Sequence, residues 1–372
     1  MRRSGWVGLL VSGLGLLLGA TGCGKGVTSP PPPGDGPLAA HQVWQDASPM
    51  PGSGWGEVLA LAPLGSSLLA GGDFIPGGAL GGVSLYQGNG RNWSVFRPDF
   101  NSQVEALGYF GGALIAAGGF TGADKATEPL DHIARWDGAT WHPLGGGTDH
   151  TVTAIAEFHG QLIAAGTFLH AGGAAAGYIA AFDGTSWHTL GAGLDAPVWA
   201  LAIYRDHLIA AGDFGLAGGA PARRIAAWDG SAWTPLGTGF FSTVLTLLSA
   251  NDTLYAGGYF TRAGGISAGH IARWDGVAWS PIGFGLGAMQ GDYVAAIATT
   301  DSGLVAGGSF EKSGATDTRF VARWKNGNWQ PMGTGLGGPV RALIVHDGQL
   351  YAGGALLDPS GASRGSLYRW AE

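Results

Sequence analysis

A unit of 46 to 50 residues recurs along nearly the whole chain, and this repeat limits the possible folds more than any other feature. Each copy contains four short apolar runs: one that opens with Val, one ending in Gly and then an aromatic residue, one ending in Trp or another aromatic, and one that begins with Trp. The Trp residues that begin the fourth run are Trp44, Trp93, Trp141, Trp187, Trp233, Trp279 and Trp329.

Turn residues separate these runs, which identifies them as strands. Asp-Gly pairs, as at Asp137-Gly138 and Asp229-Gly230, stand between the third and fourth runs, where they provide the positive φ angles of a tight hairpin. Continuous apolar runs fit sheets that are buried on both faces. Four strands in a repeat of about 40 to 50 residues are typical of a β-propeller blade.

The two ends of the chain predict how the ring closes. The last copy stops at "SLYRWAE", after its third strand, while "HQVWQDASP" at residues 41–49 matches the fourth. We therefore expect the seventh blade to combine residues 339–371 with residues 41–47, because a closed ring leaves no unpaired sheet edge. The sequence predicts an all-β, seven-bladed propeller over residues 41–372, with its last blade closed by the N-terminal strand.

Residues 1–22 have the three-part pattern of a secretory signal: Arg2 and Arg3, an apolar core, and then small residues. The following "GATGC" resembles a bacterial lipobox, with Ala20 where Leu is commoner. The resemblance implies a lipoprotein signal peptide cleaved before Cys23, the only cysteine, and lipidation of Cys23. Two or more acyl chains anchor a protein stably in a membrane. The expected location is the bacterial cell envelope, extracytoplasmic and lipid-anchored, in the outer membrane.

Between this cysteine and the first strand, residues 23–40 are rich in Pro and Gly, and we expect an extended tether. The net charge of the chain limits the class of partner that we expect. Removal of residues 1–22 takes away two bases and no acid, which leaves 17 basic against 26 acidic residues and a net charge of −9. A surface of this sign excludes nucleic acid as the expected partner.

The pattern W-D-G-x-x-W-x-P-L-G after L-I-A-A-G-x-F resembles a divergent kelch or galactose-oxidase-type blade. Gly-Gly doublets such as Gly71-Gly72 and Gly257-Gly258 match the doublet of that family, whereas the third and fourth copies have Ala165-Gly166 and Ala211-Gly212. A WD40 propeller is the neighbouring possibility because of the Trp-Asp dipeptide. The Gly-His signature of WD40 is missing and the repeat is longer, so the kelch resemblance is preferred.

No catalytic or metal set emerges from the sequence. The copper site of galactose-oxidase relatives needs a Tyr crosslinked to a Cys, and the predicted propeller contains no Cys. The histidines lack zinc-site spacing, and His132 and His270, which precede third strands in two repeats, are expected on loops. Sialidase-type Asp boxes resemble the W-D-G turns, but those aspartates form turns. We predict no cofactor, no metal and no catalytic residue.

Candidate binding residues are those that depart from the repeat. The inter-blade loops and the long connections between second and third strands should open on one face, which fold-level analogy makes the ligand face. The connections are residues 75–82, 121–131, 169–177, 215–223, 261–269, 311–319 and 357–365. The residue after the opening Val is more diverse than its neighbours, and is in order Leu59, Glu105, Thr153, Trp199, Leu245, Ala295 and Arg341.

Twelve of fifteen Trp residues fall on the two repeat columns and Trp6 lies in the signal, which leaves Trp55 and Trp199 near this face. We predict a ligand site containing Trp55, Glu105, Trp199 and Arg341, with Asp149, Asp195 and Asp292 nearby. The predicted function is a membrane-anchored binding or scaffold module for a protein or glycan. The alternative is a carbohydrate-active hydrolase or lyase on the same face.

Overall fold

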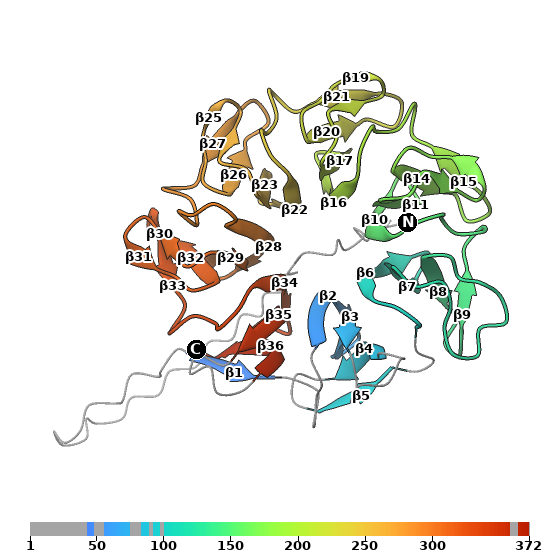
Figure 1. Cartoon of the computed structure of the whole chain (residues 1–372), viewed down its shortest axis with the longest axis horizontal. Coiled ribbons are helices and arrows are strands. Elements are labelled where there is room, and N and C mark those ends of the chain that lie inside the picture. The colour runs from blue at the N-terminus through green and yellow to red at the C-terminus, as the bar shows by residue number, and fades with distance from the viewer. Residues whose placement is uncertain are drawn as a thin grey trace, which may run out of the picture.

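Seven four-stranded antiparallel sheets surround a central opening as the blades of a propeller (Figure 1). The computed structural model describes residues 43–47, 56–74, 83–88, 92–96, 100–357 and 364–371, and this part of the chain contains strands and turns but no helix. The predicted all-β, seven-bladed fold is therefore confirmed. Among the described residues, no helix is long and apolar enough to cross a membrane.

Within each blade the first strand is innermost, because the first strands of neighbouring blades contact one another around the opening (Figure 1). The first three blades are β2 (Gly56–Leu64), β3 (Ser67–Phe74), β4 (Val83–Gly88) and β5 (Trp93–Val95); β6 (Val104–Phe110), β7 (Ala113–Gly118), β8 (Ile133–Trp136) and β9 (Trp141–Pro143); and β10 (Val152–Phe158), β11 (Gln161–Gly166), β14 (Ile179–Phe182) and β15 (Trp187–Thr189).

The next three blades repeat the same order from the inside outward. They are β16 (Val198–Tyr204), β17 (His207–Gly212), β20 (Ile225–Trp228) and β21 (Trp233–Pro235); β22 (Val244–Ala250), β23 (Thr253–Gly258), β26 (Ile271–Trp274) and β27 (Trp279–Pro281); and β28 (Tyr293–Thr300), β29 (Gly303–Ser309), β32 (Val321–Lys325) and β33 (Asn328–Pro331).

The seventh blade joins the two ends of the chain. Its strands are β34 (Val340–His346), β35 (Gln349–Leu357), β36 (Arg364–Ala371) and β1 (Val43–Asp46), with β1 antiparallel to β36 (Figure 1). Trp44 lies opposite Trp370, and their ring centroids are 5.2 Å apart in an edge-on arrangement. The predicted closure by the N-terminal strand is confirmed, and the aromatic pair matches the Trp pairs of other blades.

Fourth-strand Trp residues also fasten most blades to the one before them. The indole Nε1 of Trp187 donates to the carbonyl of Leu144 at 2.9 Å, and Trp233 donates to Leu190 at 2.8 Å. Trp279 and Trp329 repeat this bond across the next two boundaries. A buried indole N–H needs an acceptor, so a ring at this place both packs and fixes the spacing of neighbouring sheets.

A β-bulge near the start of every first strand turns one side chain toward the central opening. The register of the first two strands shifts between the opening Val and the residue two places on in all seven blades. The last Gly of the second strand makes the bulge possible: a Cβ on Gly212 would lie 2.2 Å from the carbonyl oxygen of Pro197. A bulge re-aims a side chain, and here it aims seven of them inward.

The inter-blade loops and the second-to-third-strand connections share one face, as predicted. Isolated bridges join them, for example Thr148 to Ala171 and Leu194 to Ala217. Four connections that we expected to be loops contain two-residue strands, because a tight turn lets the chain pair with itself. They are β12 (His170–Ala171) with β13 (Ala174–Ala175), β18 (Leu216–Ala217) with β19 (Ala220–Pro221), β24 (Arg262–Ala263) with β25 (Ile266–Ser267), and β30 (Lys312–Ser313) with β31 (Thr316–Asp317).

The W-D-G turns lie on the opposite face, and their chemistry differs from the prediction in one respect. Gly138 has a φ of 104°, but Asp137 has no positive φ. The Asp137 carboxylate instead accepts hydrogen bonds from the backbone N–H groups of Ala139 and Thr140, each 2.8 Å long. These bonds hold the pKa of Asp137 well below its usual value. The aspartates are therefore side-chain acceptors that close the turn.

Candidate functional site at the channel mouth

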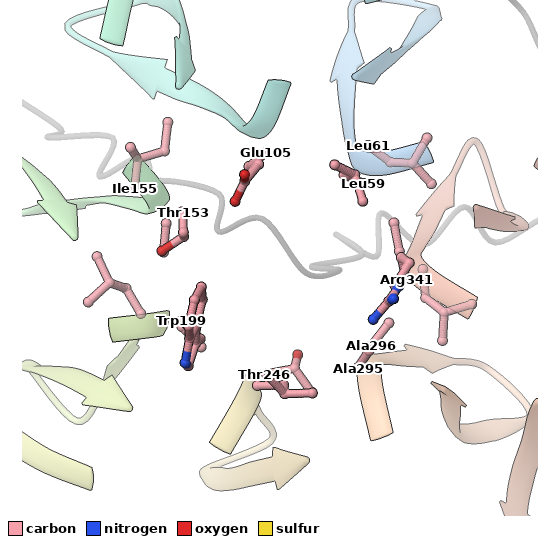
Figure 2. A pocket seen from close by; sticks show the side chains of 16 residues that line it. Leu59, Leu61, Glu105, Thr153, Ile155, Trp199, Thr246, Ala295, Ala296 and Arg341 are labelled. Carbon is pink, nitrogen blue, oxygen red and sulfur yellow. The ribbon is translucent and has the colours of Figure 1, made fainter. Parts of the chain in front are cut away.

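The bulged side chains surround a hollow of about 130 Å³ in the central opening (Figure 2). Each bulged residue is half-buried, although the residues on either side of it in the blades' first strands, such as Val198 and Ala200 beside Trp199, are buried. Residues two places further along line the same hollow with aliphatic side chains, namely Leu61, Ile155, Leu201 and Leu343. The site is thus a small recess that combines aliphatic walls with several polar groups.

Glu105, Trp199 and Arg341 all line this hollow and come from three different blades (Figure 2). The structure brings three of the four predicted ligand-binding residues together. Trp55 lies outside the described residues, as do Cys23, the signal peptide and the tether. Ligand binding by these residues stays a prediction.

Glu105 points its carboxylate into the hollow (Figure 2). The Gln103 amide Nε2 donates to Glu105 Oε1 at 3.2 Å. Burial raises the pKa of the Glu105 carboxyl above its usual value, and the Gln103 bond offsets part of this effect. A carboxylate that is withdrawn from water and has no cation beside it is costly. A positive charge in the hollow would therefore stabilise the ionised form of Glu105.

Trp199 is held in place by hydrogen bonds on the side away from Glu105. Its indole Nε1 donates to Asp213 Oδ2 at 2.8 Å, and the Thr243 hydroxyl donates to the other oxygen of Asp213 at 2.5 Å. The Arg224 guanidinium also donates to the Asp213 carbonyl. Because the indole N–H is already used, the ring offers the hollow its carbon surface in a fixed orientation.

Arg341 has its own counter-charge. Its Nε donates to Glu57 Oε1 at 2.7 Å, and its guanidinium carbon lies 5.2 Å from the centroid of the Tyr293 ring. Tyr293 in turn contacts Tyr259, with ring centroids 4.8 Å apart. These contacts neutralise Arg341 and orient it, so its charge is not available to balance Glu105.

The acidic residues predicted near the mouth serve the loops instead. Asp149 accepts the backbone N–H groups of Leu169 and His170, Asp195 accepts those of Gly215 and Leu216, and Asp292 accepts those of Ala288 and Met289. None of the three lines the hollow. The carboxylates of Asp149 and Asp195 join an inter-blade loop to the neighbouring connection, whereas Asp292 accepts from its own loop.

His270 lies on the connection before β26, as expected, but its side chain is only 5% exposed. The residue precedes its third strand with a left-handed φ of 61°, and His132 has the same conformation with a φ of 71°. Burial lowers the pKa of both His270 and His132. In the part of the chain that the structure describes, no three His, Cys, Asp or Glu side chains are grouped so that they could hold a metal ion.

Glu57, Gln103 and Tyr293 belong to the mouth, and the sequence reasoning missed them. They share one repeat position, the residue just before the opening Val. That position also varies between copies, with five residue types in the seven repeats, so the same comparison of repeats would have found them. Asp213, which orients Trp199, follows a second strand at a position that also varies between copies.

The fold and the hollow define a β-propeller with a candidate ligand site at its channel mouth. No family model matches the chain, and no curated protein matches it. The kelch-type resemblance and the lipoprotein signal therefore stay predictions.

Solved structures do resemble this one. The computationally designed Ika8 protein has a TM-score of 0.51 and 15% identity, over 88% of this chain and 100% of its own. An ancestral GH74 enzyme has a TM-score of 0.50 and 13% identity, over 89% of this chain but only 51% of the enzyme. BamB from Moraxella catarrhalis covers 84% of this chain and 94% of its own at 14% identity, with a TM-score of 0.37. Identities this low indicate likeness of fold alone.

Proposed function

We propose that the protein is a lipid-anchored, extracytoplasmic binding module that holds one side chain or terminal group of a partner in the channel mouth. The anchor is Cys23, and residues 23–40 are the tether. The partner, a protein or a glycan, contacts the face that carries the inter-blade loops. The carbohydrate-active hydrolase or lyase stays the alternative.

The observation that carries this proposal is the contrast between a constant backbone and variable side chains at the bulge. All seven blades build the same bulge over the same close-fitting Gly. Ala295 and Leu245 occupy it in two blades, so the fold itself requires neither a carboxylate nor an indole there. The presence of Glu105, Trp199 and Arg341 at these positions is therefore best explained by the hollow that their side chains face.

The size of the hollow selects a small occupant. Its volume of about 130 Å³ is below the roughly 300 to 1,000 Å³ of pockets that enclose a whole small-molecule ligand. A single side chain or chain end fits such a space, while the rest of a larger partner contacts the surrounding loops. This size favours a binding module over a site that encloses several sugar rings.

The test is retention of an envelope partner by the detergent-solubilised full chain, immobilised through its C-terminus. We compare the wild type with Glu105→Ala, Trp199→Ala and Arg341→Ala, and with the opposite-face control Asp206→Ala, which loses an exposed pair to His159. The proposal predicts a partner retained by the wild type and the control but lost with mouth variants whose melting transition is intact. Equal retention by all variants would contradict it.

A further inference from the structure

The chemistry of the hollow identifies a ligand class, and this step rests on the proposed binding function. We propose that the channel mouth binds an alkylammonium group, which a partner would supply as a lysine side chain or a free N-terminal amine. Glu105 provides the counter-charge, Trp199 the aromatic wall and Thr153 a second acceptor.

The charge balance of the mouth favours a cation. Arg341 is paired with Glu57 at 2.7 Å, whereas Glu105 has no ion-pair partner among the residues that the structure describes. The Gln103 amide contributes a neutral hydrogen bond to the carboxylate. A charged amine would replace the water that Glu105 has lost, and an anion would be repelled.

Thr153 lies between Glu105 and Trp199 around the ring (Figure 2). Its hydroxyl donates to the carbonyl of Val198 at 2.6 Å. Because its proton is directed to that carbonyl, its oxygen presents lone pairs to the hollow as an acceptor. An ammonium has three donors, so the carboxylate and the hydroxyl can each accept one and water the third.

The remaining walls suit the carbon chain behind the charge. Trp199 is fixed by its 2.8 Å bond to Asp213, and a cation near an indole face gains further attraction. Leu59, Leu61 and Ile155 give an apolar lining on the blades around Glu105. A narrow recess of about 130 Å³ accepts an unbranched chain, and the apolar lining stabilises its methylene groups.

The experiment uses the full chain in detergent with ¹⁵N-labelled tryptophan. The indole N–H resonance of Trp199, assigned with Trp199→Phe, reports on the hollow. The probes are n-butylammonium and n-butanol, which has a similar length but no charge. We expect n-butylammonium to shift the Trp199 resonance along a saturable curve, and n-butanol at equal concentration to leave it in place.

Substitutions in the hollow test whether the Glu105 carboxylate binds n-butylammonium. Glu105→Gln should weaken n-butylammonium binding at least about tenfold, because a charged hydrogen-bond partner is lost. Glu157→Gln, on β10 and away from the hollow, is the matched control and should have no effect. Thr153→Val is a second mouth variant that keeps the side-chain volume, and it should weaken binding less. Equal binding by the Glu105→Gln variant and the wild type overturns the proposal.

Two further probes distinguish the sources of the amine. Nα-acetyl-lysine methylamide carries only the side-chain ammonium, and glycinamide carries only the terminal one. The probe that binds more tightly therefore shows whether the partner supplies a lysine side chain or an N-terminal amine. If no amine binds while mouth variants still lose the envelope partner, the ligand class is wrong and the binding function stands. If no amine binds and those variants retain the partner, both proposals are wrong.

Discussion

The indole Nε1 of Trp44 donates a hydrogen bond to the carbonyl oxygen of Met332 at 3.2 Å, although 288 residues separate them in the chain. On the other side of the same blade, Trp93 donates to the carbonyl of Ala47 at 2.8 Å. The N-terminal strand is thus fastened to the sixth blade before it and the first blade after it. Closure of the ring depends on this strand.

Trp44→Ala should lower the free energy of unfolding by about 3 to 5 kcal/mol, because it removes a ring that is 6% exposed and the hydrogen bond to Met332. Val43→Ala in the same strand is the control: this side chain is 41% exposed, and its loss should cost less than about 0.5 kcal/mol. Chemical denaturation measures both. Similar midpoints for the two variants would mean that β1 does not fasten the ring.

Gly212→Ala should destabilise the fourth blade and distort the bulge that aims Trp199. The added Cβ would lie 2.2 Å from the Pro197 carbonyl oxygen, so the backbone must shift, at a cost of about 1 to 3 kcal/mol or more. Gly215→Ala makes only an ordinary contact at 3.6 Å and serves as the control. Thermal melting compares the two, and equal stability would contradict the close-packing account of the Gly.

Glu105 should make the folded protein less stable as the pH rises. Burial raises the pKa of Glu105 in the folded protein, so its stabilising contribution is complete below the unfolded pKa of about 4 and is lost as pH rises through the folded pKa. Glu105→Gln should therefore melt above the wild type at pH 7 and approach it near pH 4. A difference that is constant between pH 4 and pH 8 would show that the carboxyl does not titrate in this way.

The predicted anchor is tested at Cys23, the only cysteine. Bacterial cells that express the chain and are fed radioactive palmitate should label it, and Cys23→Ser should abolish the label because the acyl chains have no attachment site. Membrane fractionation should show the variant released from the envelope. Label that persists in the variant would refute lipidation at this residue.

The repeat predicted the fold because blade construction uses the same residues in every copy. Trp44 could be matched to the other fourth-strand Trp residues, so even the closing strand was visible in the sequence. Glu105, Trp199 and Arg341 were found as departures from one repeat column. The bulge, which gives that column its inward direction, depends on a backbone register that residue identities do not reveal.

Other contacts had no signature in the sequence. The ion pair of Arg341 with Glu57 joins residues that are far apart in the chain, and only closure of the ring brings their blades side by side. His270 was expected on a loop because it precedes a third strand, and its burial to 5% exposure was not foreseen. The Asp149 carboxylate was considered for ligands, but two backbone N–H groups and the His170 ring already occupy it.

The most direct test of the binding function is protection of the hollow in intact envelopes. Ala295→Cys places a thiol in the hollow wall, and Ala139→Cys places one on an exposed turn of the opposite face. We measure labelling by N-ethylmaleimide in envelopes and in the purified protein. The account predicts slower labelling at position 295 in envelopes, restored by Glu105→Gln, with no change at position 139. Labelling at position 295 that is equally fast in envelopes and in the purified protein would contradict it.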